Sequence, residues 1–244
     1  MRRPGRDRRN LGASRARDPI DVIMGSKLQL LFRAEDANAS QWVDRKRGVV
    51  LTASGTPTLN TADANFNLHP SVQLTSAAQR YETLTPSSWL APSQQSYWIA
   101  VCCRINTTPA STVSLVQTQY SGSPTDAFNL QYVSGGTARV LASDGASQKQ
   151  LTKTATMATS VLMTANLLGP VEGQQLTLAE GGSIATSTSL GAFVVDSLDR
   201  LCIGSFAGTS ALASVVFVAV GSGEMLSNER GNLRSYCQSY YGIP

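Results

Sequence analysis

The sequence has 244 residues, of which 42% are hydrophobic and 15% charged, and its formal net charge is +4. The apolar share can build a core for one large β-sandwich or for two small domains, and a charged share below the roughly 25% of ordinary domains suits short strands joined by turns. No apolar run approaches the roughly 20 residues of a membrane span, so we expect neither a membrane helix nor a membrane partner.

Residues 1–24 are predicted to form a basic, extended N-terminal arm. The first 20 residues hold seven arginines against two aspartates, which gives this segment a net charge of +5, whereas the rest of the chain is close to neutral. A segment with high charge and low hydrophobicity cannot bury a core of its own, and its charge indicates a separate partner. The arginines of the arm are Arg2, Arg3, Arg6, Arg8, Arg9, Arg15 and Arg17.

Three roles are open for this arm. It can dock on an acidic protein surface, it can neutralise the phosphates of a nucleic acid as the Arg-rich tails of many small viral coat proteins do, or it can stay solvated. We favour protein docking, because seven arginines with two aspartates and no lysine are a modest charge for holding a genome. A secretory signal is not expected, because no apolar run of about 7–15 residues follows the positive charges.

Residues 25 to about 222 show the pattern of many short strands. Leu28, Leu30 and Phe32 alternate with other residues, which is typical of a strand with one buried face, and 97–105 is apolar on both faces, as expected for a central strand. Clusters rich in Gly, Ser, Pro and Asp separate the strands, and together they predict a sandwich or barrel. Further strands are expected at 114–119, 128–133, 140–142, 161–168, 175–179, 201–205 and 215–220, with turns at 121–126, 134–136, 143–145, 169–173 and 180–182.

Residues 224–244 change to a helical period. Ser227 is a suitable N-cap, and Glu229 places a negative charge in the first turn, where the helix dipole favours it. Gly242 stands where a glycine commonly ends a helix. We therefore predict a closing helix over about 227–241, whose apolar stripe consists of Leu233, Tyr236, Cys237 and Tyr240.

Two segments carry a resemblance to a known family. The ending VVFVAVGSGEMLSNERGNLRSYCQSYYGI (215–243) resembles the last strand and closing helix of concanavalin A-like, laminin-G-like lectin-fold domains of phage virion structural proteins. Residues 28–59 are similar to the opening of that family, with Trp42 as the matching tryptophan, and 97–105 is similar to its central strand. The likeness is loose over 27–210 and more specific over 215–243.

The resemblance implies a two-sheet antiparallel β-sandwich, a concanavalin A-like jelly roll of about a dozen strands over residues 25–244. Such domains often bind glycans or fasten onto a virion. The sequence departs from the family in two respects, because Val215–Val220 contains no carboxylate and no Asp/Asn cluster matches a calcium site. No sugar-binding or metal-binding residue is therefore transferred, and we expect no metal and no cofactor.

Catalysis is not expected. Sandwich glycosidases of this type use a strand with the pattern Glu-x-Asp-x-x-Glu, which is absent here, to place two carboxylates across a bond. Glu35 and Asp36 are adjacent and are predicted to form a solvated turn pair. His69 is the only histidine, which removes a Ser-His-Asp triad and most metal sites unless it acts alone.

The cysteines and aromatic residues have simple structural interpretations. Without a Cys-x-x-Cys pattern, we expect the four thiols to be small buried hydrophobes, with neighbouring Cys102 and Cys103 on opposite strand faces. Trp42 and Trp98 are predicted core residues. Sugar-stacking candidates, each of which can equally be a core or seam residue, are Trp89, Tyr97, Tyr120 and Tyr132; the remaining thiols are Cys202 and Cys237.

The sequence thus predicts a non-enzymatic accessory protein of a phage virion, either a capsid decoration or a head- or tail-attached fibre or adhesin. Its expected partners are other virion proteins (capsid, portal or tail) and copies of itself, with a cell-surface glycan as a further candidate. We expect it in the virion, assembled in the host cytoplasm. The alternatives are a viral coat protein whose Arg-rich arm binds packaged nucleic acid, and a secreted or cell-surface lectin.

Overall fold

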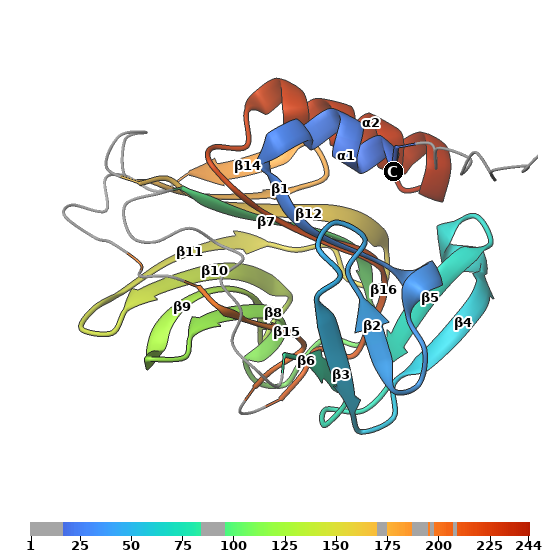
Figure 1. The fold of residues 1–244 in the computed structure, drawn as a ribbon, viewed down its shortest axis with the longest axis horizontal. Coiled ribbons are helices and arrows are strands. Elements are labelled where there is room, and N and C mark those ends of the chain that lie inside the picture. The colour runs from blue at the N-terminus through green and yellow to red at the C-terminus, as the bar shows by residue number, and fades with distance from the viewer. Residues whose placement is uncertain (1–16, 84–95, 170–174, 187–194, 196–197, 207–208) are drawn as a thin grey trace, which may run out of the picture.

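The chain folds into two eight-stranded antiparallel sheets that pack face to face, as the computed structural model shows (Figure 1). The structure describes residues 17–83, 96–169, 175–186, 195, 198–206 and 209–244. This arrangement confirms the predicted β-sandwich. The outer sheet, which carries the helices, has the order β14 (Ser183–Thr186), β13 (Leu176–Glu180), β12 (Ser160–Leu167), β7 (Tyr97–Ile105), β16 (Ala213–Ser222), β5 (His69–Leu74) and β4 (Thr58–Asp63), with β1 (Leu28–Arg33) also paired to β16.

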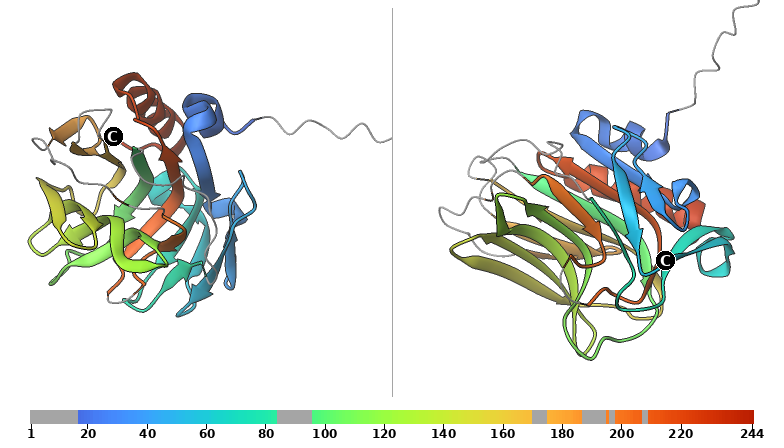
Figure 2. Two further views of the ribbon diagram at one scale, coloured as in Figure 1. Left: turned by 60° about the vertical axis from the view of Figure 1, so that its left-hand side comes forward. Right: turned by 60° about the horizontal axis from the view of Figure 1, so that its bottom comes forward.

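Among the residues that the structure describes, no helix covers the outer face of the second sheet. Its strands are β11 (Gln148–Thr154), β10 (Thr137–Asp144), β9 (Ser123–Val133), β8 (Val113–Tyr120), β15 (Arg200–Ile203), β6 (Arg80–Glu82), β3 (Val50–Ser54) and β2 (Gln41–Val43). Two α-helices, α1 (Pro19–Met24) and α2 (Ser227–Tyr241), lie side by side on the outer face of the first sheet (Figure 2). Short 3-10 helices occur at Gly25–Lys27, Ala34–Asp36 and Ala64–Phe66.

The central strand β7 separates two hydrophobic layers. Alternate residues such as Val101 and Cys103 enter the core between the sheets, whereas Trp98 and Cys102 enter the layer beneath the helices. Both predictions for this segment are confirmed: it is buried on both faces, and the two adjacent thiols point in opposite directions. Trp42 is fully buried in the core between the sheets, where its Nε1–H donates to the Arg33 carbonyl oxygen at 2.6 Å.

The closing helix is confirmed, with changes at both its start and its stripe. Leu226 occupies the N-cap, and its backbone N–H donates to the Glu229 carboxylate at 2.7 Å, so Ser227 is the first helical residue. Gly242 ends the helix in the left-handed conformation with φ 67°. The buried side chains of the helix are Leu233, Cys237 and Tyr241. The helix therefore turns Tyr241 toward the sheet in place of Tyr240, which is 40% exposed.

The predicted boundary of the arm at residue 24 is wrong, because Pro19–Met24 forms α1. The side chain of Asp18 accepts the Ile20 N–H at 2.9 Å, and a proline at the first helical position has the φ that a helix requires. Ile20 and Met24 are buried in the layer shared with α2. Within the described residues, the arm therefore joins the folded domain at Asp18.

Several strands escaped prediction. The cluster at 121–126 was expected to be a turn, but β9 begins at Ser123, because a tight two-residue turn suffices to join it to β8. Strand β11 is polar and mostly exposed, since it lies at a sheet edge, and this hides the alternation that marks a strand. The short strands between residues 41 and 82 were missed for a similar reason, as each buries only a few apolar side chains.

Candidate functional site

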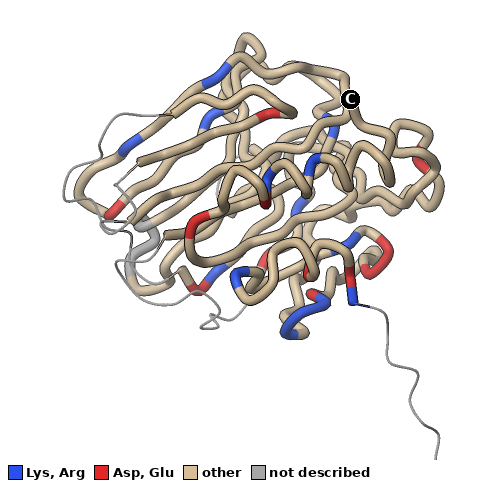
Figure 3. The backbone as a smooth tube through the Cα atoms, turned by 90° about the horizontal axis from the view of Figure 1, so that it is seen from above, with Lys and Arg blue, Asp and Glu red and all other residues tan. Residues whose placement is uncertain are grey.

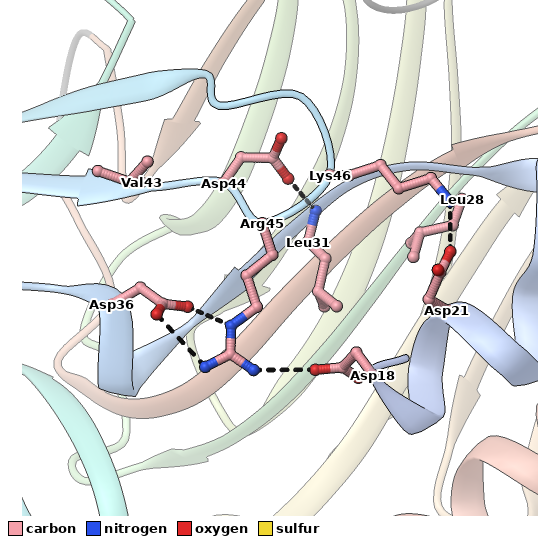
Figure 4. Close-up of a pocket in the computed structure, with 9 residues that line it drawn as sticks. All are labelled: Asp18, Asp21, Leu28, Leu31, Asp36, Val43, Asp44, Arg45 and Lys46. Carbon is pink, nitrogen blue, oxygen red and sulfur yellow. Dashed lines mark hydrogen bonds and ion pairs between the residues drawn. The ribbon is translucent and has the colours of Figure 1, made fainter. Parts of the chain in front are cut away.

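A charged cleft of about 750 Å³ lies where the arm meets the folded domain (Figure 4). Helix α1, strand β1 and the loop between β2 and β3 form its walls, so segments from three parts of the chain meet there. We call it the junction cleft. Its lining residues are Asp18, Asp21, Leu28, Leu31, Asp36, Val43, Asp44, Arg45 and Lys46.

Asp18 connects this cleft to a buried arginine. The Arg33 side chain is only 3% exposed, and its Nη2 and Nε contact the two Asp18 carboxylate oxygens at 2.6 and 3.0 Å. The same guanidinium donates to the hydroxyl oxygens of Tyr236, at 2.9 Å, and Tyr241 on α2, and it lies 5.7 Å from the ring centroid of Phe217. Arg33 therefore joins the residue at the base of the arm to the closing helix.

The ionisation of these groups follows from their surroundings. Burial acts to raise the pKa of Asp18, but the hydrogen bonds and charge of Arg33 outweigh it and hold that pKa below its ordinary value. Burial acts to lower the pKa of Arg33, but Asp18 and the two tyrosines outweigh it and raise that pKa. Burial raises the pKa of Tyr241. The acid and the arginine are thus both charged at neutral pH.

The other aspartates of the junction cleft also have hydrogen-bond or ion-pair partners. Asp36 is bound by Arg45, which reaches Asp18 as well at 3.0 Å, and Asp21 is bound by Lys46. Asp44 accepts backbone N–H groups on both of its carboxylate oxygens, although burial raises its pKa. Acidic and basic residues therefore alternate around the base of α1 (Figure 3). Each of the four aspartates of the cleft has a partner from the folded domain.

The structure describes only one of the seven arginines predicted to dock a partner. Arg17 is exposed and directly precedes Asp18. Arg2, Arg3, Arg6, Arg8, Arg9 and Arg15 lie outside the described residues. The structure therefore does not test the arm as a docking element, and this assignment stays a prediction.

The residues considered for catalysis are spread over unrelated places. The His69 ring stacks on Tyr240 with 3.9 Å between ring centroids, and Glu35 and Asp36 contact Arg45. Among the described residues, no group of three or more His, Cys, Asp or Glu side chains could hold a metal ion. Within the same ranges, no helix is long and apolar enough to cross a membrane.

The cysteines and aromatic residues serve mainly to fill the core. All four thiols are free and buried, which confirms the prediction for them, and burial raises the pKa of Cys103 and Cys202. Tyr97 and Tyr132, two of the four sugar-stacking candidates, are at most 1% exposed and cannot meet a ligand. Tyr120 is half-buried, and Trp89 lies outside the described residues.

The Arg33 contacts were not predicted from sequence. Arg33 is the only charged residue of β1, whose other residues are apolar except Gln29, and a single charge in such a strand was the available signal that it has a buried partner. Nothing in the sequence indicated that this partner is Asp18, since the acid precedes a helix that was assigned to the arm.

Known structures share this fold, although no protein-family model matches the sequence and no curated protein matches it either. The binding domain of botulinum neurotoxin serotype G aligns with a TM-score of 0.66 at 11% identity, over 89% of this chain and 54% of that one. Type C botulinum neurotoxin, which enters cells in a manner dependent on interaction with two ganglioside molecules, aligns with a TM-score of 0.66 at 9% identity, over 90% and 53%.

A third similar structure is Trypanosoma rangeli sialidase in complex with sialic acid, with a TM-score of 0.60 at 16% identity, over 85% of this chain and 32% of that one. The chain thus spans about half or less of these proteins. At such low identities the likeness shows the fold alone, which is a lectin-like β-sandwich. The resemblance noted in the sequence is confirmed at this level, and its narrower part, the link to phage virion proteins, stays a prediction.

Proposed function

We propose that this protein is a non-enzymatic accessory of a phage virion, anchored to other particle proteins by its basic arm. The observation that supports the proposal is that the aspartates of the junction cleft have partners within the domain. Each aspartate around the base of α1 is engaged by Arg33, Arg45, Lys46 or a backbone N–H group. The arm attaches next to these acids, and each of them already has a hydrogen-bond or ion-pair partner in the domain.

The proposal is that a partner from outside the domain supplies the matching charge. Residues 1–20 have a net charge of +5, and opposite charges steer association as well as stabilise the bound state. An acidic surface on a capsid, portal or tail protein, or on another copy of this chain, fits this requirement. The proposed location is accordingly the virion, assembled in the host cytoplasm.

Deletion of residues 2–16 tests the anchor. This deletion spares Asp18 and α1, so the sandwich is expected to keep the melting temperature of the full chain while its incorporation into particles falls to background. A second variant has glutamate in place of the arginines of the arm. It keeps the length of the arm and reverses its charge, so it separates the effect of charge from that of length. Full incorporation of the truncated protein would refute the anchoring proposal.

The same purified protein tests the nucleic-acid alternative. Salt-sensitive retention of nucleic acid, lost on deletion of 2–16, would replace the proposal with a coat protein whose arm binds phosphates. Protein docking instead predicts an absorbance ratio at 260 and 280 nm typical of protein alone and salt-sensitive binding to particles that lack the genome.

A second candidate function is glycan binding. Proteins that share this fold over part of their length include Trypanosoma rangeli sialidase, solved in complex with sialic acid, and the type C neurotoxin, whose cell entry depends on gangliosides. Transfer of either property to this chain is a proposal that rests on fold similarity. Binding of the full chain to an array of neutral and acidic glycans would support it, and a complete lack of binding would exclude it.

A further inference from the structure

A second cavity, of about 280 Å³, lies beside the closing helix, and its lining includes Pro244, which follows that helix. It is formed by the end of β11, the loop to β12, the β13–β14 hairpin and Arg234 of α2. We call it the Arg234 cavity. Its volume is near the lower end of small-molecule sites, which suits a single sugar ring.

Arg234 is the residue that indicates a bound ligand. Its Nε–H is buried and has no hydrogen-bond acceptor among the described residues, and its guanidinium forms no ion pair with them. A buried donor without an acceptor is costly, and its presence in a native structure indicates an unobserved water, ion or ligand. The planar fork of an arginine matches a carboxylate or a phosphate.

The backbone holds this guanidinium in place. A Cβ atom added at Gly182 would lie 2.6 Å from Arg234 Nη1 and 3.2 Å from Cζ, so the glycine permits the guanidinium to lie against the hairpin. Lys153, on another wall of the cavity, makes only a weak contact with the Thr154 carbonyl oxygen at 3.4 Å. Two cationic side chains without ion-pair partners in the described chain therefore border one small cavity.

The same cavity also contains a hydrogen-bond acceptor. Glu180 is only 7% exposed, and its Oε1 accepts the Thr156 N–H at 2.6 Å. Its Oε2 accepts no hydrogen bond from the described residues, so it is free for a ligand hydroxyl. Ser183 adds a hydroxyl of the protein to the lining.

We propose that the Arg234 cavity binds an acidic sugar residue. The carboxylate of the sugar is bound by Arg234 with support from Lys153, and a sugar hydroxyl donates to Glu180. A bare anion would satisfy only the cations and would be repelled by Glu180, whereas a neutral sugar would leave the Arg234 N–H groups without a charged acceptor. This proposal rests on the glycan-binding function proposed above and is independent of the arm.

The outer face of the second sheet provides a useful contrast. There Arg139 donates to Gln131 at 2.6 and 2.9 Å and to Gln150 at 3.3 Å, so its donors already have acceptors from the protein. The Gln117 side chain likewise accepts the Phe206 N–H at 2.7 Å. Polar residues are thus present on both surfaces, but of these two surfaces it is the Arg234 cavity that, among the described residues, has a buried donor without an acceptor.

The test uses the full chain and four probes in solution: the methyl glycosides of glucuronic acid, N-acetylneuraminic acid and glucose, and inorganic phosphate. Calorimetric or NMR titration is expected to show binding of at least one acidic sugar, with the neutral glucoside and phosphate about tenfold weaker or more. The two acidic probes distinguish a uronic acid from a sialic acid. Comparable binding of glucose or phosphate would overturn the proposal.

Three variants locate the site. Arg234→Gln is expected to weaken binding of the acidic sugar about tenfold or more, since it removes a charge-assisted bidentate contact. Gly182→Ala keeps every charge but displaces the guanidinium, and it should weaken the same probe several-fold while glucose binding is unchanged. Arg230→Gln, on the same helix but outside the cavity lining, is the matched control and should bind as the wild type does.

Each variant is first checked by its circular dichroism spectrum and melting temperature, so that loss of binding is not confused with unfolding. Acidic-sugar binding that survives in both the Arg234 and Gly182 variants would overturn the site but leave the glycan-binding function standing. Absence of binding to all three glycosides, and to a broader glycan array, would overturn both.

Discussion

The Asp18→Asn substitution tests whether the Arg33 contacts hold the base of the arm to the sandwich. Asparagine has nearly the same shape as aspartate and is an equally good N-cap, so α1 keeps its cap and only the charge is lost. Arg33, with its side chain 3% exposed, then remains buried without its carboxylate partner. The change thus isolates the ion pair from the geometry of the helix.

The expected loss of stability is about 2–3 kcal/mol. Removing one member of a buried ion pair costs roughly 3–5 kcal/mol, and three features reduce this figure here. The Asp18 side chain is 11% exposed, the asparagine oxygen still accepts one hydrogen bond, and Tyr236 and Tyr241 still accept from the guanidinium. For a chain of this size the loss corresponds to a fall of about 5–10 °C in melting temperature.

Chemical denaturation at pH 7 measures this loss, with Asp21→Asn as the matched control. Asp21 contacts Lys46 in a more exposed ion pair, whose loss costs about 0–1 kcal/mol. Equal effects of the two substitutions would refute the assignment of Arg33 as the residue that joins the arm's base to α2.

The pH dependence gives a second criterion. The pKa of Asp18 is lowered on folding, so its contribution to stability is complete above its unfolded pKa and is lost as the pH falls through the folded one. The difference between the wild type and Asp18→Asn should therefore be constant from neutral pH down to about pH 5 and shrink below about pH 4. A difference that persists undiminished at pH 2 would contradict the role of the charge.

Further predictions concern the core and the termination of the closing helix. Gly221→Ala would place a Cβ atom 2.1 Å from two ring carbons of Trp98, so we expect a loss of at least about 3 kcal/mol, or failure to fold, in a denaturation experiment. Gly242→Ala, at φ 67° and without a severe clash, should cost only about 1 kcal/mol in the same assay. The four buried thiols should not react with a thiol reagent in the native protein and should all react in denaturant; fast native labelling would contradict their burial. Burial raises the pKa of Tyr81 to about 12, so ultraviolet titration should find its phenol protonated at pH 10.5, and complete ionisation of the tyrosines by that pH would contradict this.

Elements with a strong hydrophobic pattern were predictable from the sequence. Strand β7 was predicted with its bounds, because Arg104 is its only charged residue and a short apolar run rich in aromatic and β-branched residues favours a buried central strand. The closing helix was predicted from its period and its glycine stop. Helix α1 was missed, because six residues beside an Arg-rich segment show little periodicity, and its stability comes from Ile20 and Met24 packing on α2.

The candidate sites were harder to predict, because each depends on contacts between distant segments. Asp18 and Arg33 are separated by 15 residues, and Arg33 and Tyr241 by 208. Arg234 and Gly182 become neighbours only once α2 lies across the hairpin. A sequence pattern reports local periods and composition, whereas which buried cation finds a partner is decided by the packing of the whole sandwich.

The junction cleft and the Arg234 cavity differ in whether the domain itself supplies partners for their polar groups. In the junction cleft the domain supplies a partner for each aspartate, which is compatible with the proposal that the arm binds another molecule. In the Arg234 cavity the domain supplies a cation and a carboxylate but leaves a buried N–H group of Arg234 without an acceptor. An anchoring arm requires that the aspartates beside it have partners within the domain, because an arm bound to its own domain could not reach another molecule. A ligand site requires polar groups that lack a partner in the domain, because side chains that already satisfy one another gain little from a ligand.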